Sequence, residues 1–198
     1  MSNTRILRIG LWTAVALAIA ALAWFQLIQP RMTQPGAHSD LGKGDYQLVT
    51  TEGEAFTQAD MRGQPTAVFF GFTHCPDVCP TTLGEVMVWQ DELADDGQQL
   101  RVLFMTVDPE RDTPEVLHEY VSWVPSVTGV TGDPDEVAKA IRAFRIYAAK
   151  SPLSAGDYTM DHSTQVLLFD DRGDYFGLIG YQEDHERAMG TLRRLLAS

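Results

Sequence analysis

The chain has 198 residues, of which 44% are hydrophobic and 21% are charged. That is the size and composition of one folded domain with an appendage, which excludes a disordered or collagen-like chain. Two basic residues and no acidic one precede Pro30, and the remainder carries 13 basic and 27 acidic residues, a net charge of −14. Such a domain repels nucleic acid and anionic lipid head groups, so nucleic-acid binding is excluded. The same acidity either favours a cationic partner or metal ions, or is only that of a soluble surface.

The first predicted element is a membrane anchor at residues 11–28. These 18 consecutive residues carry no charge, and a helix of that length covers roughly 27 Å, close to the hydrocarbon core of a bilayer at about 30 Å. Arg5 and Arg8 precede the segment, so the positive-inside rule keeps the N-terminus in the cytoplasm and exports everything after Pro30. A cleaved signal peptide is the alternative, because residues 21–23 resemble a cleavage site. Apolar residues continue past that point, as an anchor requires.

Three parts are therefore predicted along the chain. Residues 1–29 form a cytoplasmic tip and a transmembrane anchor, residues 30–45 form a flexible tether rich in proline and glycine, and residues 46–198 form the folded domain. The protein is expected to be a single-pass protein of the cytoplasmic membrane, bound to the bilayer through its N-terminal helix. Its C-terminal domain is then expected in the periplasm or another extracytoplasmic space.

Strands and helices alternate through the predicted domain. Strands are predicted at residues 46–51, 66–72 and 101–107, and helices over residues 83–94, after Thr113–Pro114, after Asp133–Pro134 and from about residue 183 to 196. The third of these helices carries an apolar face that extends to Ala148 and has Glu136 at the capping-box position. Residues 165–169 and 175–179 flank a turn and predict a β-hairpin. This order predicts a thioredoxin-like α/β sandwich, a mixed central sheet flanked by helices.

The only two cysteines lie four positions apart, in the motif Cys75-Pro-Asp-Val-Cys79-Pro80. In an oxidising compartment such a pair is a disulfide, a metal site, or each in turn. The motif lies between a buried strand and a helix, where α/β folds display reactive groups. Because proline disfavours the α conformation in the residue before it, both cysteines are expected in a turn ahead of a helix that begins at Pro80. The three-residue spacer favours a metal chelate over thioredoxin-type redox chemistry without forbidding a disulfide.

His162 is the best candidate for a third ligand, because it precedes the predicted strand at residues 165–169 and can face the cysteines. Asp161 and Ser163 flank it with polar groups able to orient its imidazole. Two thiolates and one imidazole suit Cu(I), and they also accept Cu(II) or zinc. Asp77, inside the cysteine motif, either tunes the charge of the metal or meets a partner, or it caps the turn.

At these residues the sequence resembles the Sco/SenC family of copper chaperones. Three segments carry the resemblance in order along the chain, namely residues 70–80 with the cysteine motif, residues 107–114 (Val-Asp-Pro-Glu-Arg-Asp-Thr-Pro), and Asp161-His162-Ser163. The resemblance implies that Cys75, Cys79 and His162 bind one copper ion, as Cu(I), Cu(II) or both. It also implies delivery of copper to the CuA-bearing subunit of cytochrome c oxidase during assembly, with another periplasmic copper chaperone as candidate donor. Residues 147–161 are less similar to the family pattern.

A thiol–disulfide oxidoreductase is the alternative function, because some relatives act as reductants of the cysteines that will hold CuA. In that function one cysteine attacks a target disulfide and the other resolves the intermediate, and His162 is not needed. A peroxiredoxin-like peroxidase is disfavoured by the second cysteine so close by. A purely structural disulfide would constrain the unfolded chain little, because its loop is so short. The leading interpretation is thus a binding protein rather than an enzyme, in which a Cys75–Cys79 disulfide would abolish metal binding.

Overall fold

The computed structural model describes residues 8, 11–13, 15, 17–18 and 40–198. The chain divides into two compact units, Met1–His38 and Ser39–Ser198. In the first unit the described residues are helical, and the rest of the predicted anchor at residues 11–28 lies outside the described residues. Across the described ranges, none of the helices combines the length and the apolar character that a membrane crossing requires.

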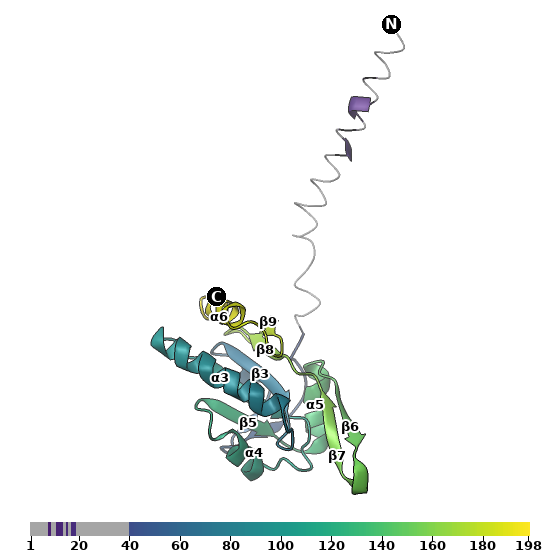
Figure 1. Cartoon of the computed structure of the whole chain (residues 1–198), viewed down its shortest axis with the longest axis vertical. Coiled ribbons are helices and arrows are strands. Elements are labelled where there is room, and N and C mark those ends of the chain that lie inside the picture. Colours follow the sequence, from purple (N-terminus) through teal and green to yellow (C-terminus); the bar gives the residue numbers. More distant parts are fainter. Residues whose placement is uncertain (1–7, 9–10, 14, 16, 19–39) are drawn as a thin grey trace. The chain divides into compact units, whose positions relative to one another are not determined.

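The second unit is built on a seven-stranded mixed sheet (Figure 1). In spatial order its strands are β2 (Ala55–Phe56), β1 (Leu48–Thr50), β5 (Val127–Thr131), β4 (Arg101–Thr106), β3 (Thr66–Gly71), β8 (Val166–Phe169) and β9 (Tyr175–Ile179). The central strands β5, β4 and β3 are parallel to one another. At one edge β1 pairs antiparallel with both β5 and β2, and at the other β8 pairs antiparallel with both β3 and β9. Every residue of β3 is buried, as predicted for a strand covered on both faces.

Helices cover both faces of this sheet. They are α3 (Val78–Asp95), α4 (Pro114–Val121), α5 (Pro134–Ala143) and α6 (His185–Leu196). Neighbouring residues of a strand point to opposite faces, and β3 shows this directly. Phe69 packs on Phe104, which in turn contacts Tyr120 of α4. Phe70 instead packs on Phe144 at the end of α5, with ring centroids 5.2 Å apart.

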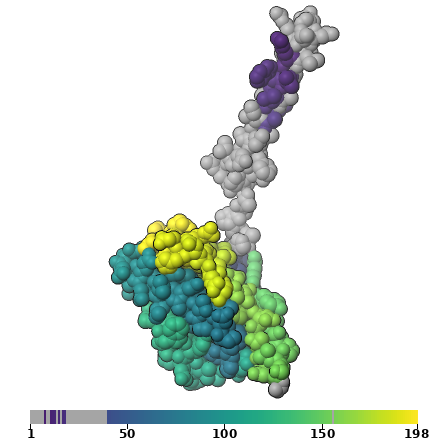
Figure 2. Space-filling view, in the orientation of Figure 1, coloured from purple at the N-terminus to yellow at the C-terminus, as the bar shows by residue number. Residues whose placement is uncertain are grey.

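The C-terminal helix α6 lies against α3, as the adjoining yellow and blue surfaces in Figure 2 show. The contact is polar at its edge, where Arg193 binds Glu92 at 2.8 Å and Asp96 at 2.9 Å. Beneath it, one side of α6 is fully buried against the sheet, including Met189 and Leu192. Because α3 carries part of the cysteine motif, this packing fixes the helix on which one half of the candidate site is built.

A second sheet stands apart from the first and consists of β6 (Ala148–Pro152) paired antiparallel with β7 (Tyr158–His162). This hairpin was not predicted from the sequence. His162 does lie ahead of the predicted strand, which is β8, but it is also the last residue of β7. The helical face predicted to reach Ala148 is wrong, because α5 ends at Ala143. Arg145 then adopts a positive φ of 53°, in the left-handed region that stops a helix. Strands β2 and β5 were also missed.

Most of the other predicted elements agree with the structure. The thioredoxin-like fold class is confirmed, and the predicted hairpin is present as β8 and β9. Thr113 caps α4 as expected, accepting the backbone N–H of Val116. Asp133 caps α5, but Glu136 does not close a capping box, because its carboxylate accepts the backbone N–H of Gln47 at 2.8 Å. Leu41, in the segment predicted as a tether, is buried against the domain with 5% exposure.

Candidate metal centre

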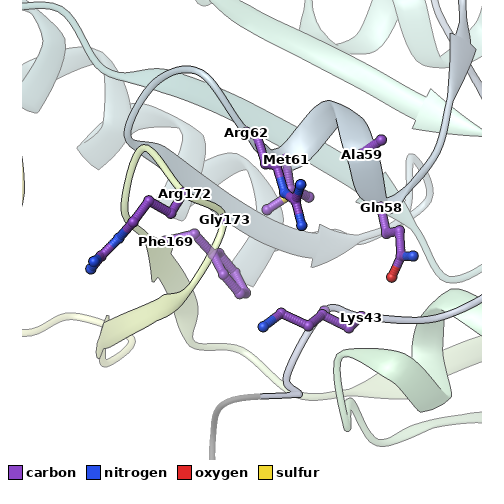
Figure 3. Close-up of a pocket in the computed structure, with 9 residues that line it drawn as sticks. Lys43, Gln58, Ala59, Met61, Arg62, Phe169, Arg172 and Gly173 are labelled. Atoms are coloured by element: carbon purple, nitrogen blue, oxygen red, sulfur yellow. The ribbon is translucent and has the colours of Figure 1, made fainter.

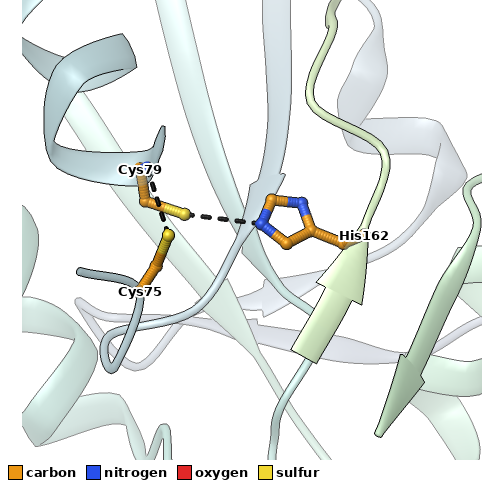
Figure 4. Close-up of side chains that lie close together, drawn as sticks. All are labelled: Cys75, Cys79 and His162. Carbon is orange, nitrogen blue, oxygen red and sulfur yellow. Dashed lines mark hydrogen bonds between the residues drawn. The ribbon is translucent and has the colours of Figure 1, made fainter. Parts of the chain in front are cut away.

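Cys75, Cys79 and His162 meet beyond the carboxyl end of β3, and one nitrogen of His162 and the two Sγ atoms all lie within 4.8 Å of one another. Figure 4 shows how three elements supply them: the loop after β3, the first turn of α3, and the last residue of β7. Both thiols are free. The carboxyl ends of parallel strands are where α/β sheets gather ligand-binding groups. The structure thus brings together the three residues that the sequence singled out.

The position of Cys79 differs from the prediction. Helix α3 begins at Val78, so Cys79 lies in its first turn and not ahead of it. Pro80 is tolerated in this first turn, because the first N–H groups of a helix have no intrahelical partner to lose. Asp77 occupies the N-cap, but its side chain makes no capping hydrogen bond and is exposed to solvent. Of the two alternatives predicted for Asp77, capping of the turn by its side chain is therefore wrong, and a role in tuning the charge of the metal or in meeting a partner stays a prediction.

The two thiols differ in their electrostatic environment. The side chain of Cys79 donates a hydrogen bond to Cys75, and the backbone N–H groups of Cys79 and Asp77 also stabilise the Cys75 sulfur as an anion. These bonds hold the pKa of Cys75 well below that of a free cysteine. The same bond to Cys75, together with complete burial, raises the pKa of Cys79. Cys75 is therefore the more acidic thiol of the pair, and Cys79 is the less acidic one.

The imidazole of His162 is fixed in one tautomer. Its Nδ1 lies 2.8 Å from the backbone carbonyl oxygen of Ser163, and a carbonyl can only accept, so Nδ1 carries the proton. Nε2 then has a free lone pair, and it lies 3.6 Å from the Sγ of Cys79 (Figure 4). Metal-bound histidines usually have such a partner on the second nitrogen. Asp161 and Ser163 were both predicted to offer a polar group that orients the imidazole. At Ser163 this group is the backbone carbonyl, whereas Asp161 is exposed to solvent.

Aromatic rings hold the imidazole from the protein side. Phe72 meets it edge-on with centroids 5.7 Å apart, and Phe69 does so at 6.3 Å. On the solvent side lies a pocket of about 310 Å³, lined by Phe72, Cys75, Pro76, Asp77, Val78, Tyr147, Thr159, Met160, Asp161, His162 and Thr164. Cys75 is half-buried at this pocket, whereas Cys79 is inaccessible. The pocket thus gives a route from solvent to the sulfur of Cys75 and to His162.

Asp112 binds the start of the cysteine loop, and this role was not predicted from the sequence. It is fully buried, and its carboxylate accepts the hydroxyl of Thr73 at 2.6 Å, the backbone N–H of Thr73, and the hydroxyl of Thr106 at 2.6 Å. Burial raises the pKa of Asp112 even though these bonds oppose the shift. Thr73 lies two residues before Cys75, so Asp112 fixes the start of the loop. Its place in the segment 107–114 was the available signal.

A second pocket, of about 260 Å³, contains no cysteine or histidine (Figure 3). Its basic side chains include Lys43 and Arg172, which pair with Asp174 at 2.9 Å and Asp170 at 2.6 Å. The charges of Lys43 and Arg172 are thus balanced by neighbouring carboxylates. Arg62 also lines this pocket.

Comparison with known proteins identifies the family. A family model described as SCO1/SenC matches residues 34–197. The chain belongs to the SCO1/SenC family. The human protein SCO2 homolog, mitochondrial, is 35% identical over 177 residues, which cover 87% of this chain and 66% of the relative. The chain spans about half to two thirds of the length of the curated relatives SCO2 from Saccharomyces cerevisiae and its human homolog.

Solved structures of SCO1/SenC proteins share the fold. The structure of Bradyrhizobium japonicum ScoI with copper bound is 41% identical and matches with a TM-score of 0.71, covering 79% of this chain and 99% of that one. BsSco, described as a member of the Sco family of cytochrome c oxidase assembly proteins and as having a disulfide switch, matches with a TM-score of 0.62 over 80% of this chain and 95% of that one. At 19% identity, this second likeness concerns the fold alone.

Proposed function

We propose that this protein binds one copper ion through Cys75, Cys79 and His162 and delivers it to the CuA-bearing subunit of cytochrome c oxidase. The observation that carries the proposal is the convergence of two sulfurs and one imidazole nitrogen within 4.8 Å. Two sulfur donors with one nitrogen suit copper, which prefers soft ligands. The copper bound to the related ScoI supports the choice of metal over zinc.

The three ligands are proposed to act in sequence. Cys75 is accessible and already ionised, so it meets the incoming ion first. His162 has its Nε2 lone pair free and its other nitrogen bound to Ser163. Cys79 is buried and protonated, so it releases a proton when the metal binds. Transfer to the target then proceeds by exchange of ligands at the open side of the pocket, beside Cys75.

The remainder of the proposal concerns location and partners. We infer that residues 11–28 anchor the protein in the cytoplasmic membrane, because the segment is uncharged and follows Arg5 and Arg8. The domain then faces the extracytoplasmic side, where the CuA-bearing subunit is assembled. Another periplasmic copper chaperone is the proposed donor. The acidic surface of the domain favours a partner with a basic docking face.

A thiol–disulfide reductase is the second candidate, favoured by the unequal thiols. An accessible thiolate at Cys75 beside a protonated, buried Cys79 is the arrangement of an attacking and a resolving cysteine. In this function the electrons of both thiols pass to a target disulfide, which becomes two thiols while Cys75 and Cys79 form a disulfide. His162 would have no direct part in that exchange.

Copper titration of the reduced full-length protein tests the proposal. We expect one equivalent of Cu(I) or Cu(II) to bind, and His162→Ala to weaken binding by more than the roughly 10- to 100-fold that loss of an outer-sphere partner costs. His185→Ala is the matched control, because that histidine is exposed and pairs with Glu92 away from the cysteines. Equal affinity in wild type and His162→Ala would refute the copper site. Unchanged disulfide reduction by His162→Ala, without copper binding by either protein, would favour the reductase.

A further inference from the structure

The strand that carries His162 lies outside the main sheet. Within residues 40–198, β7 pairs with β6 and with no strand of the main sheet, so these two strands form a sheet of their own. Antiparallel two-stranded hairpins are marginally stable by themselves. The three residues 163–165 lead from His162 into β8, and the direction in which β7 runs from there depends on side chains that join this hairpin to the rest of the domain.

Arg111 makes that connection from the loop between β4 and α4. Its guanidinium lies 3.9 Å from the ring centroid of Tyr158, and its Nη1 donates to the backbone carbonyl of Tyr158 at 3.0 Å. Its Nε donates to Asp108. The same guanidinium faces the ring of Phe72 at 5.9 Å, and Phe72 is a wall of the imidazole pocket. One side chain thus contacts the hairpin, its own loop and the aromatic wall of the site.

Asp108 completes the connection. It is almost fully buried at 1% exposure, and its second carboxylate oxygen accepts the hydroxyl of Tyr158 at 2.8 Å. Tyr158 is therefore held at its ring face, its hydroxyl and its backbone carbonyl. Tyr158 and His162 are the first and last residues of β7, and they lie on the same face of the strand because side chains alternate. Fixing one end of β7 fixes the direction in which the other end presents its imidazole.

The same loop also holds the opposite half of the site. Asp112, four residues after Asp108, binds the hydroxyl and backbone N–H of Thr73 at the start of the cysteine loop. The segment 108–112 therefore contacts both ligand-bearing arms, through Asp112 on the cysteine side and through Arg111 and Asp108 on the histidine side. A single short loop sets the separation of the two arms.

We propose that Arg111, together with Asp108 and Tyr158, is a positioning group that holds β7 so that the imidazole of His162 faces the two sulfurs. The arginine fork suits this role, because it stacks on a ring and donates several hydrogen bonds in one plane. Lysine cannot reproduce that combination. The proposal depends on the proposed copper site only for its effect on metal affinity, since the placement of the imidazole is a property of the metal-free protein.

The test follows the His162 ring by NMR in the reduced, metal-free, full-length protein. In wild type, Phe72 and Phe69 should shift the His162 ring protons by their ring currents. In Arg111→Met these protons should move towards the values of a free histidine, and Arg111→Lys should not restore them. Tyr158→Phe, which keeps the ring and removes only the hydroxyl, should give a smaller shift. Arg172→Met is the matched control, because that arginine also pairs with an aspartate but lies in the β8–β9 turn.

Copper titration of the same variants is the second measurement. Arg111→Met should bind copper about 10- to 100-fold more weakly, and its Cu(II) spectrum should shift from that of wild type towards that of His162→Ala. Unshifted His162 protons in folded Arg111→Met would overturn the proposal, and so would full affinity. If Arg111→Met does not fold, Tyr158→Phe decides, and unshifted His162 protons there would overturn the proposal. If wild type binds no copper, the copper function fails while the NMR comparison still tests the positioning group.

Discussion

Gly71, the last residue of β3, makes room for the buried thiol of the site. A Cβ at this position would lie 2.7 Å from the ring of Phe104 and 2.8 Å from the Sγ of Cys79. Both neighbours are fully buried and have little space to retreat. A larger residue would therefore push the sulfur of Cys79 away from Cys75 and His162. The geometry of the site thus requires a glycine at position 71.

Gly71→Ala should therefore destabilise the domain by about 1–3 kcal/mol, as overpacking of a dense core does. It should also weaken copper binding. Gly84→Ala is the matched control, because no atom lies within 4 Å of its added Cβ in α3, and alanine should stabilise a helix interior by roughly 0.5–1 kcal/mol. Urea denaturation measures both. Equal stability of Gly71→Ala and wild type would contradict the crowding argument.

The buried carboxyl of Asp112 should make stability depend on pH. Its pKa in the folded state is raised above the ordinary value of 3.8, chiefly by burial. Between the pKa of Asp112 in the unfolded chain and its higher pKa in the folded state, the unfolded chain binds fewer protons than the folded protein. The free energy of unfolding should therefore fall as pH rises through this window and level off above it. Relative to wild type, Asp112→Asn should therefore become more stable across the same window.

Denaturation of wild type and Asp112→Asn at a series of acidic pH values checks this expectation. Asp170→Asn is the control of opposite sign. Burial raises the pKa of Asp170, but bonds from Arg172 and from the backbone of Asp174 lower it overall. Wild type should therefore gain stability relative to Asp170→Asn as pH rises. A difference between Asp112→Asn and wild type that does not change with pH would count against a buried, proton-holding Asp112.

At the scale of elements, helix α5 shows how local signals fix one end of a helix better than the other. Asp133 and Pro134 define its start, and the carboxylate of Asp133 accepts the N–H of Asp135 at 2.9 Å. The end of the helix is set by Arg145, which adopts a left-handed conformation. Glycine is the usual residue in that conformation, and because position 145 is not a glycine, the sequence gives no signal for this end. The apolar pattern continues beyond that point into β6, which explains why the predicted helix was too long.

Asp133→Ala should cost about 0.5–2 kcal/mol of stability, because it removes the side-chain acceptor at the start of α5. Asp133→Ser should recover most of the loss, since serine also caps helices well. The measurement is the free energy of unfolding in urea, with circular dichroism as the signal. If alanine and serine destabilise the domain equally, the hydrogen bond to Asp135 does not stabilise the helix.

At the scale of the whole domain, the site depends on chain topology. Cys79 and His162 are 83 residues apart in the chain and reach one another only because β3 and β8 are neighbours in the sheet. The loop 108–112, which follows β4 on the other side of β3, reaches both arms of the site. Three segments of the chain thus meet at this edge of the sheet: the cysteine loop with the start of α3, the loop 108–112, and the end of β7. They supply the ligands and the residues that position them. Packing of α3 against α6 holds the first of these segments in place.

Sequence patterns alone were enough to predict the fold class, the buried strands β3 and β4, the C-terminal hairpin and the convergence of Cys75, Cys79 and His162. These follow from signals that are local in the chain: apolar periodicity, proline and capping residues, and the rare chemistry of cysteine and histidine. The β6–β7 hairpin, the tautomer of His162 and the contacts of Arg111 and Asp112 could be found only in the folded domain. Those features depend on contacts between residues tens of positions apart, whose energies no local pattern records.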